Sequence, residues 1–158
     1  MSTSTNELST NPILPKSAAA DIINAARLRR GLTWSRIAAE LGADPVWSTA
    51  ALLGQHPLTP EQAQTVCDLL GLDASVAESL RLQPYRGTGP VELADPTIYR
   101  LTEAISVYGP ALKALIHEEF GDGIMSAINF RIGIDRRRDP DGDRVIVTLD
   151  GKFLDYQW

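Results

Sequence analysis

Two charged residues, Arg100 and Glu103, lie three positions apart in the segment DPTIYRLTEAI at 95–105, so they share one face if the segment is helical. Such a pair is most often an exposed ion pair of little energetic weight. Here apolar residues surround the pair: Ile98, Leu101, Ala104 and Ile105. We expect them to shield the guanidinium partly from water, which would strengthen its hold on an anion.

A serine interrupts the apolar face of a predicted strand in GDGIMSAINF at 121–130. After Gly123, alternate side chains share a face, and that face holds Ile124, Ser126, Ile128 and Phe130. The ordinary explanation is that the hydroxyl bonds a nearby carbonyl. As a nucleophile Ser126 would need an adjacent base, and neither His56 nor His117 lies in a nucleophile motif. We expect Ser126 to donate a hydrogen bond to a bound anion.

The residues give little support to a metal site or a nucleotide-binding site. One cysteine, Cys67, and two distant histidines supply no zinc set. The acidic run DPDGD at 139–143 lacks the pattern of a calcium loop and is better explained as a solvated turn. There is no Walker A motif, and GTG at 87–89 is too short for a dinucleotide fingerprint.

The composition is that of a globular protein. The chain has 158 residues, of which 44% are hydrophobic and 22% charged, and its net charge of −5 gives no general attraction to nucleic acid or an anionic membrane. A single cysteine allows no intrachain disulfide and favours a reducing, cytoplasmic setting. The polar N-terminus does not resemble a signal peptide, and no apolar run is long enough to span a membrane.

The pattern along the chain predicts two domains, mainly α and of the α+β class. Residues 1–16 are expected to be a flexible arm, 17–82 a helical bundle, 83–94 a linker loop and 95–158 a catalytic and dimerisation domain. The last of these begins helical, with an interruption at Gly109 and Pro110, and ends in a β-hairpin whose turn contains DRRRDPDG at 135–142. A lone hairpin with one apolar face is marginal in water, so we expect an oligomer built through this half.

The segment LTWSRIAAELGADPVWSTAALLG at 32–54 has the layout of a helix-turn-helix. Its second helix, PVWSTAALL, contains none of the Lys, Arg, Asn or Gln side chains that usually read bases. Residues 1–82 carry six basic and eight acidic side chains, a net charge of −2, whereas a DNA-binding domain should present a basic face. We therefore favour a packing role and no nucleic-acid partner, and keep a regulator with a C-terminal dimerisation domain as the alternative function.

The chain also resembles the cyanase family, also called cyanate hydratase or cyanate lyase. The resemblance rests on DPTIYR at 95–100 with its spacing to Glu103, on 107–130, on VTLDGKFL at 147–154, and on N-terminal helices that include TAALLGQ at 49–55. It implies a bicarbonate-dependent decomposition of cyanate to carbamate and carbon dioxide, the carbamate then giving ammonia and carbon dioxide. Bicarbonate is a co-substrate, and no metal or organic cofactor takes part.

The same resemblance assigns the site and the assembly. The family's catalytic Arg, Glu and Ser correspond to Arg100, Glu103 and Ser126. C-terminal halves intertwine into dimers, five dimers form a decamer, and the active sites lie between subunits. Retention of all three residues argues against a degenerate relative that keeps only the assembly.

Overall fold

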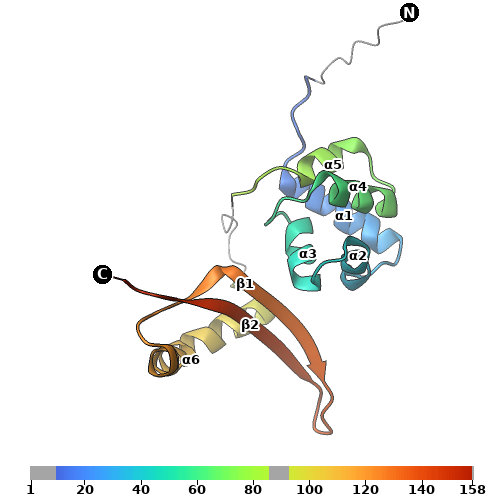
Figure 1. The fold of residues 1–158 in the computed structure, drawn as a ribbon. Helices are drawn as coiled ribbons and strands as arrows, with labels where there is room; N and C mark the ends of the chain where they lie inside the picture. Colours follow the sequence, from blue (N-terminus) through green and yellow to red (C-terminus); the bar gives the residue numbers. More distant parts are fainter. Residues whose placement is uncertain (1–9, 86–92, 158) are drawn as a thin grey trace, which may run out of the picture. The chain divides into compact units, whose positions relative to one another are not determined.

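The computed structural model describes residues 10–85 and 93–157. The first nine residues of the expected arm and residues 86–92 of the expected linker lie outside the described residues. The chain divides into two compact units, one of residues up to 86 and one from 87 onward, and each is described here by itself (Figure 1).

The first unit consists of five short helices: α1 (Lys16–Arg29), α2 (Trp34–Leu41), α3 (Pro45–Leu52), α4 (Pro60–Leu70) and α5 (Ala74–Leu80). Side-chain caps fix where the later helices begin. The Thr33 hydroxyl accepts from Arg36 N–H, the Asp44 carboxylate accepts from Val46 N–H, and Thr59 forms a capping box with Gln62. Gly42 and Gly71 end α2 and α4 in the left-handed conformation, which glycine adopts readily.

One apolar core holds these five helices together. Its largest fully buried apolar side chains are Ile23, Ile37, Leu52, Val66 and Cys67. Trp34 and Trp47 pack against this core as partly buried residues, with Arg27 stacked over the Trp34 ring at 4.5 Å. The aromatics therefore serve packing, which agrees with the role expected for the helix-turn-helix segment α2–α3.

The second unit begins with a single long helix, α6 (Pro96–Phe120), capped by the Asp95 carboxylate. The predicted interruption at Gly109 and Pro110 is wrong, because α6 runs through both residues. Proline removes one N–H from the helix and crowds the residue before it. Gly109 has no Cβ to crowd, and the helix surface here is open to solvent, so the turn persists. No helix within the described residues is both long and apolar enough to cross a membrane.

A two-stranded antiparallel hairpin follows, formed by β1 (Gly123–Arg137) and β2 (Arg144–Asp155). The hairpin was predicted, but its turn is shorter than expected, because Arg136 and Arg137 still pair with Val145 and Arg144. The register is regular from Phe130 to the turn, and again from Gly123 to Met125. Between these stretches residues 126–129 of β1 stand opposite only Lys152 of β2, which makes a large, irregular bulge.

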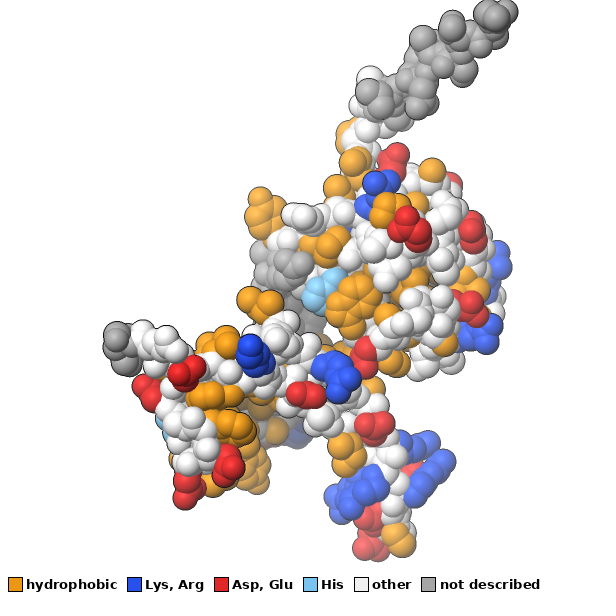
Figure 2. Space-filling model, viewed as in Figure 1, with side chains coloured by type: hydrophobic (Ala, Val, Ile, Leu, Met, Phe, Trp, Pro, Cys, Tyr) orange, Lys and Arg blue, Asp and Glu red, His pale blue; other side chains and the backbone are white. Residues whose placement is uncertain are grey.

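The bulge overturns the predicted alternation of faces. Ile128 is 98% exposed, whereas Ser126 is 6% exposed, so the two do not share one dry face. Among the described residues of the second unit, Gly123 and Ser126 alone are buried, and α6 buries none of its side chains. Figure 2 shows hydrophobic side chains gathered over this unit, with charged side chains concentrated at the hairpin tip.

Candidate active site

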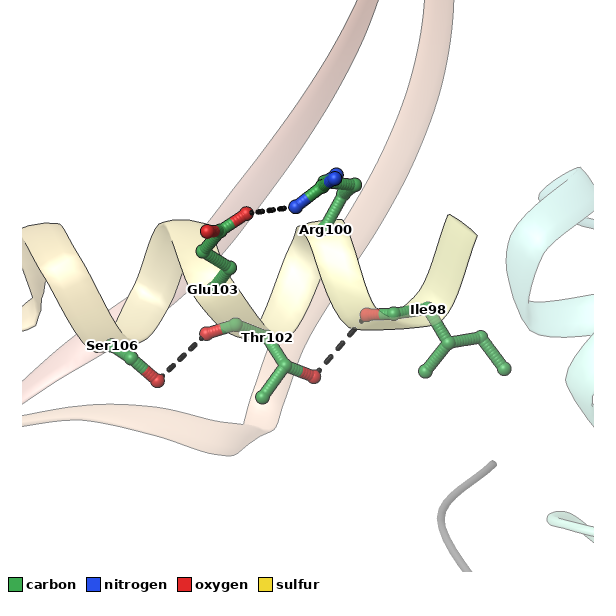
Figure 3. A network of polar contacts seen from close by, with 5 residues as sticks. All are labelled: Ile98, Arg100, Thr102, Glu103 and Ser106. Carbon is green, nitrogen blue, oxygen red and sulfur yellow. Dashed lines mark hydrogen bonds and ion pairs between the residues drawn. The ribbon is translucent and has the colours of Figure 1, made fainter. Parts of the chain in front are cut away.

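Arg100 and Glu103 form an ion pair on the first turns of α6, where Asp95 and Pro96 set the start of the helix. Nη1 of Arg100 donates to Oε2 of Glu103 at 2.7 Å. The three-residue spacing brings both side chains to one side of the helix, while Thr102, Ser106 and Ile98 project from the other side (Figure 3). The pairing predicted from the spacing is therefore present in the single chain.

The apolar shield expected around this pair is not supplied by the described residues of the second unit. The side chains of Arg100 and Glu103 are 71% and 45% exposed, and Ile98 points to the opposite side of the helix. The guanidinium lies 5.7 Å from the ring of Tyr99, which is itself exposed. The described residues of the second unit therefore leave this arginine open to water.

Ser126 is held by the bulge of β1. Its Oγ accepts hydrogen bonds from the backbone N–H of Ile128 at 3.1 Å and of Asn129 at 2.9 Å. The hydroxyl therefore satisfies two donors of an irregular strand, rather than bonding a carbonyl as the ordinary explanation had it. This explains why a serine can be buried in an otherwise apolar segment.

The end of α6 is tied to the start of β1 by residues that sequence reasoning did not assign to the site. Nε2 of His117 lies 3.3 Å from the carbonyl oxygen of Gly123, and the Phe120 and Phe153 rings stack at 5.2 Å. These contacts fix the root of the strand that carries Ser126. His117 therefore has a structural role at the start of β1.

Within one chain the three predicted site residues fall into two groups. At about 1.5 Å per residue, α6 carries Arg100 roughly 30 Å from Phe120, the residue that stacks at the foot of the hairpin. Among the described residues no hydrogen bond or ion pair joins Ser126 to Arg100 or Glu103. The same residues contain no group of three or more His, Cys, Asp or Glu placed to hold a metal ion.

Family comparison decides the class to which this arrangement belongs. Residues 16–84 match the family described as "Cyanate hydratase, N-terminal", and residues 90–158 match the "Cyanate lyase C-terminal domain". The chain belongs to the cyanate hydratase family. Arg100, Glu103 and Ser126 all lie within the C-terminal match, as the resemblance required.

Individual members of the cyanate hydratase family agree over nearly the whole chain. The cyanate hydratase of Mycolicibacterium vanbaalenii is 55% identical over 142 residues, which is 89% of this chain and 92% of that protein. That of Laccaria bicolor is 49% identical over 142 residues, covering 88% of this chain and 86% of that protein. Both units are therefore shared with the relatives.

The fold agrees as well. The crystal structure of cyanase from T. urticae matches with a TM-score of 0.77 at 40% identity, over 86% of this chain and 96% of that chain. This supports the α+β class, with a helical unit followed by a helix and a hairpin. Because the matched families and relatives are cyanate hydratases, the alternative of a transcriptional regulator has no support from them.

Proposed function

We propose that the protein decomposes cyanate with bicarbonate as co-substrate, giving carbamate and carbon dioxide, and that the carbamate then yields ammonia and a second carbon dioxide. The observation that carries this proposal is the match of both units to the cyanate hydratase family, with Arg100, Glu103 and Ser126 inside the C-terminal match. Residues 95–158 are the proposed catalytic and dimerisation domain. Residues 17–82 are proposed as a helical unit that binds no DNA.

The chemistry needs no activated side-chain nucleophile. The bicarbonate oxygen forms a bond to the electrophilic carbon of cyanate, and the adduct carries two negative charges. The nitrogen of the adduct takes up one proton from outside, and the proton of the bicarbonate hydroxyl also moves to this nitrogen. Cleavage of the bond between the bicarbonate carbon and the bridging oxygen then releases carbon dioxide and leaves carbamate. The task of the protein is to bring two anions together and to stabilise the charge of their adduct. Because the substrates supply both electrophile and nucleophile, we propose that no metal or organic cofactor takes part.

Arg100 and Ser126 are the proposed anion-binding groups. The guanidinium offers several N–H donors in a fixed fork that suits carboxylate-like oxygens. The serine hydroxyl adds a neutral donor that does not titrate. Since Arg100 and Ser126 fall into separate groups within one chain, the proposed site brings them together from neighbouring subunits.

Glu103 has two proposed roles. Its 2.7 Å bond to Arg100 orients the guanidinium. Its carboxyl group is also a candidate to deliver a proton to the nitrogen of cyanate. A permanent negative charge would repel both substrates, so we propose that Glu103 either stays tightly bonded to Arg100 or carries the proton in the complex.

The assembly is proposed from the exposed surface of α6. Apolar residues recur along the helix at alternating spacings of three and four, and all of them are exposed in the single chain: Ile98, Leu101, Ile105, Tyr108, Leu112 and Leu115. Such a stripe is typical of a helix that packs along another helix. We propose that a second copy covers it in an intertwined dimer, and that five dimers form a decamer in the cytoplasm.

A single assay tests the activity. Ammonia release from cyanate is followed with and without added bicarbonate, in wild type and in Arg100→Ala. Ammonia that appears only with bicarbonate, and only in wild type, is the expected result. A protein that shifts DNA in a gel and leaves cyanate untouched would instead identify the regulator, and an assembled protein inert to both would identify a degenerate relative.

A further inference from the structure

The surroundings of Ser126 are complete within a single chain, unlike the rest of the second unit. Ser126 and Gly123 are the two buried residues among those described from 93 to 157. Every apolar side chain of α6 is left exposed or half-exposed for a partner to cover. β1 and β2 of a single chain therefore form the bulge that holds the serine, without contacts from a second copy.

The hydrogen bonds of this bulge fix what the Ser126 hydroxyl can do. A hydroxyl oxygen has two acceptor lone pairs and one O–H donor. The N–H groups of Ile128 and Asn129 occupy both acceptor positions, at 3.1 and 2.9 Å. The O–H donor is the group that remains to bind a substrate. The two hydrogen bonds that the hydroxyl oxygen accepts from the amides polarise the O–H, which makes it a stronger donor. An oxygen engaged in this way is a poor nucleophile and a good donor to an anion.

A glycine on the facing strand leaves the room that this arrangement requires. Gly151 lies opposite Phe130, at the end of the bulge. A methyl group at position 151 would lie 2.5 Å from the carbonyl oxygen of Ser126 and would also overlap Cγ of Met125. The methionine side chain can move away, but the carbonyl belongs to the backbone of the bulge. Any side chain at 151 must therefore displace the peptide unit that carries Ser126.

We propose that Gly151 is a positioning residue for Ser126: by lacking a side chain, it lets β1 fold into the bulge that turns Ser126 into a dedicated hydrogen-bond donor. This inference rests on the proposed function, because it assigns Gly151 a part in holding the anionic reactants. Glycine inside a strand commonly marks a bulge or a close backbone approach. Here the approaching backbone belongs to a residue of the proposed site.

The chain supplies a matched control for the test. Gly133 lies in the same hairpin, opposite Thr148, and a methyl group there would meet no atom within 4 Å. Gly151→Ala and Gly133→Ala therefore make the same chemical change, with and without contact to the bulge. Both variants and wild type are first compared by size-exclusion chromatography with light scattering, to establish that they assemble equally.

The first measurement is amide hydrogen exchange of Ile128 and Asn129 in the assembled protein. Ser126→Ala removes the shared acceptor and should speed exchange of both amides by about tenfold. Gly151→Ala should speed the same two amides by a similar factor, and Gly133→Ala should leave them unchanged. A general loss of stability would instead raise exchange throughout the hairpin.

The second measurement is steady-state ammonia release. A donor that acts mainly on the doubly charged adduct affects kcat more than KM, and a misplacement of about 1 Å can cost about a hundredfold. Gly151→Ala should therefore lower kcat by about a hundredfold with a smaller change in KM for bicarbonate. Gly133→Ala should stay within about twofold of wild type, because its methyl group meets no neighbouring atom.

The outcomes separate the inference from the proposed function. Wild-type exchange at Ile128 and Asn129 in an assembled Gly151→Ala protein overturns the inference, whatever the activity. Loss of bicarbonate-dependent activity in wild type overturns the function, and the exchange comparison still tests the placement. If Gly151→Ala does not assemble, the double variant Met125→Ala/Gly151→Ala, which removes the side-chain overlap, replaces it. Failure of that protein to assemble also overturns the inference, since Gly151 would then be needed for folding.

Discussion

Arg100 donates from Nη1 to Oε2 of Glu103 at 2.7 Å, one helical turn along α6. The ion pair forms in the single chain, although both side chains are largely open to solvent. An exposed pair of this kind adds little to stability, so its role is to orient the guanidinium. The carboxylate keeps the guanidinium in one orientation, and that orientation is available when a second chain or a substrate excludes water.

Removal of the guanidinium should abolish most of the activity. Arg100→Ala loses the single positive charge assigned to the reacting anions, and we expect kcat/KM to fall by at least about 100- to 1,000-fold. Arg100→Lys keeps the charge but loses the planar fork, so its loss should be intermediate. Steady-state ammonia release at saturating bicarbonate measures both.

The matched control is another exposed arginine with a carboxylate partner. Arg36 contacts Glu40 through an ion pair of 2.6 Å on α2, far from the proposed site in sequence. Arg36→Ala should change kcat/KM by less than about twofold, as expected for a surface pair. Equal losses in Arg36→Ala and Arg100→Ala would contradict a specific role for Arg100.

Ser126→Ala should lower kcat by about 100- to 1,000-fold, the cost of losing one donor to a developing anion. Ser126→Thr retains an O–H and should recover part of that loss. Ser106→Ala is the control, since its hydroxyl donates to the Thr102 carbonyl at 2.9 Å on the exposed surface of α6. Kinetics on all three variants checks the expectation, and wild-type rates in Ser126→Ala would remove Ser126 from the site.

Local signals predicted most of the helical architecture. Thr33, Asp44, Thr59 and Asp95 belong to residue types that commonly cap helices, each precedes a periodic segment, and each accepts a backbone N–H at the start of its helix. Capping is decided within one turn of helix, so a single sequence contains the whole interaction. The same locality explains why the spacing of Arg100 and Glu103 sufficed to predict their contact.

Features that depend on contacts between strands could not be predicted from the sequence. Strict alternation placed Ile128 beside Ser126, but the bulge opposite Lys152 breaks the alternation and turns Ile128 outward. The bulge depends on Gly151, which is distant in sequence, so no local pattern reveals it. Pro110 also does not end the helix. Gly109 before it removes the usual steric crowding, and a prediction that treats Gly and Pro as separate helix breakers leaves out this effect of the pair.

Charge placed in the exposed stripe of α6 should break the assembly. Leu112→Glu puts a carboxylate into the stripe that a second copy is proposed to cover, and an unpaired buried charge is strongly unfavourable. We expect a smaller particle by light scattering, together with loss of ammonia release. Leu28→Glu, at an exposed leucine of α1, should leave the mass unchanged. A monomeric Leu112→Glu protein with full activity would contradict a site shared between subunits.

The buried thiol of Cys67 should be unreactive in the folded protein. Its side chain is 2% exposed, and burial, with the nearby charges of Asp68 and Asp73, raises the pKa of the thiol above its ordinary value of 9.0. The thiolate is therefore scarcer in the folded than in the unfolded protein, and this thiol makes the fold less stable as pH rises above 9.0. A colorimetric thiol reagent at pH 8 should react fully in denaturant and slowly without it. Fast reaction of the assembled protein would contradict this burial.

Glu103→Gln separates the two roles proposed for this carboxyl group. Glutamine can still accept from Arg100 through its amide oxygen, but it carries no charge and cannot release a proton to the nitrogen of cyanate. If proton delivery dominates, kcat should fall by about 100- to 10,000-fold with little change in KM. If orientation of Arg100 dominates, the loss in kcat should be smaller, with KM for both anions raised. The kcat and KM values of wild type and Glu103→Gln, compared at one pH, distinguish these results, and unaltered turnover would contradict both roles, leaving Arg100 and Ser126 to account for catalysis.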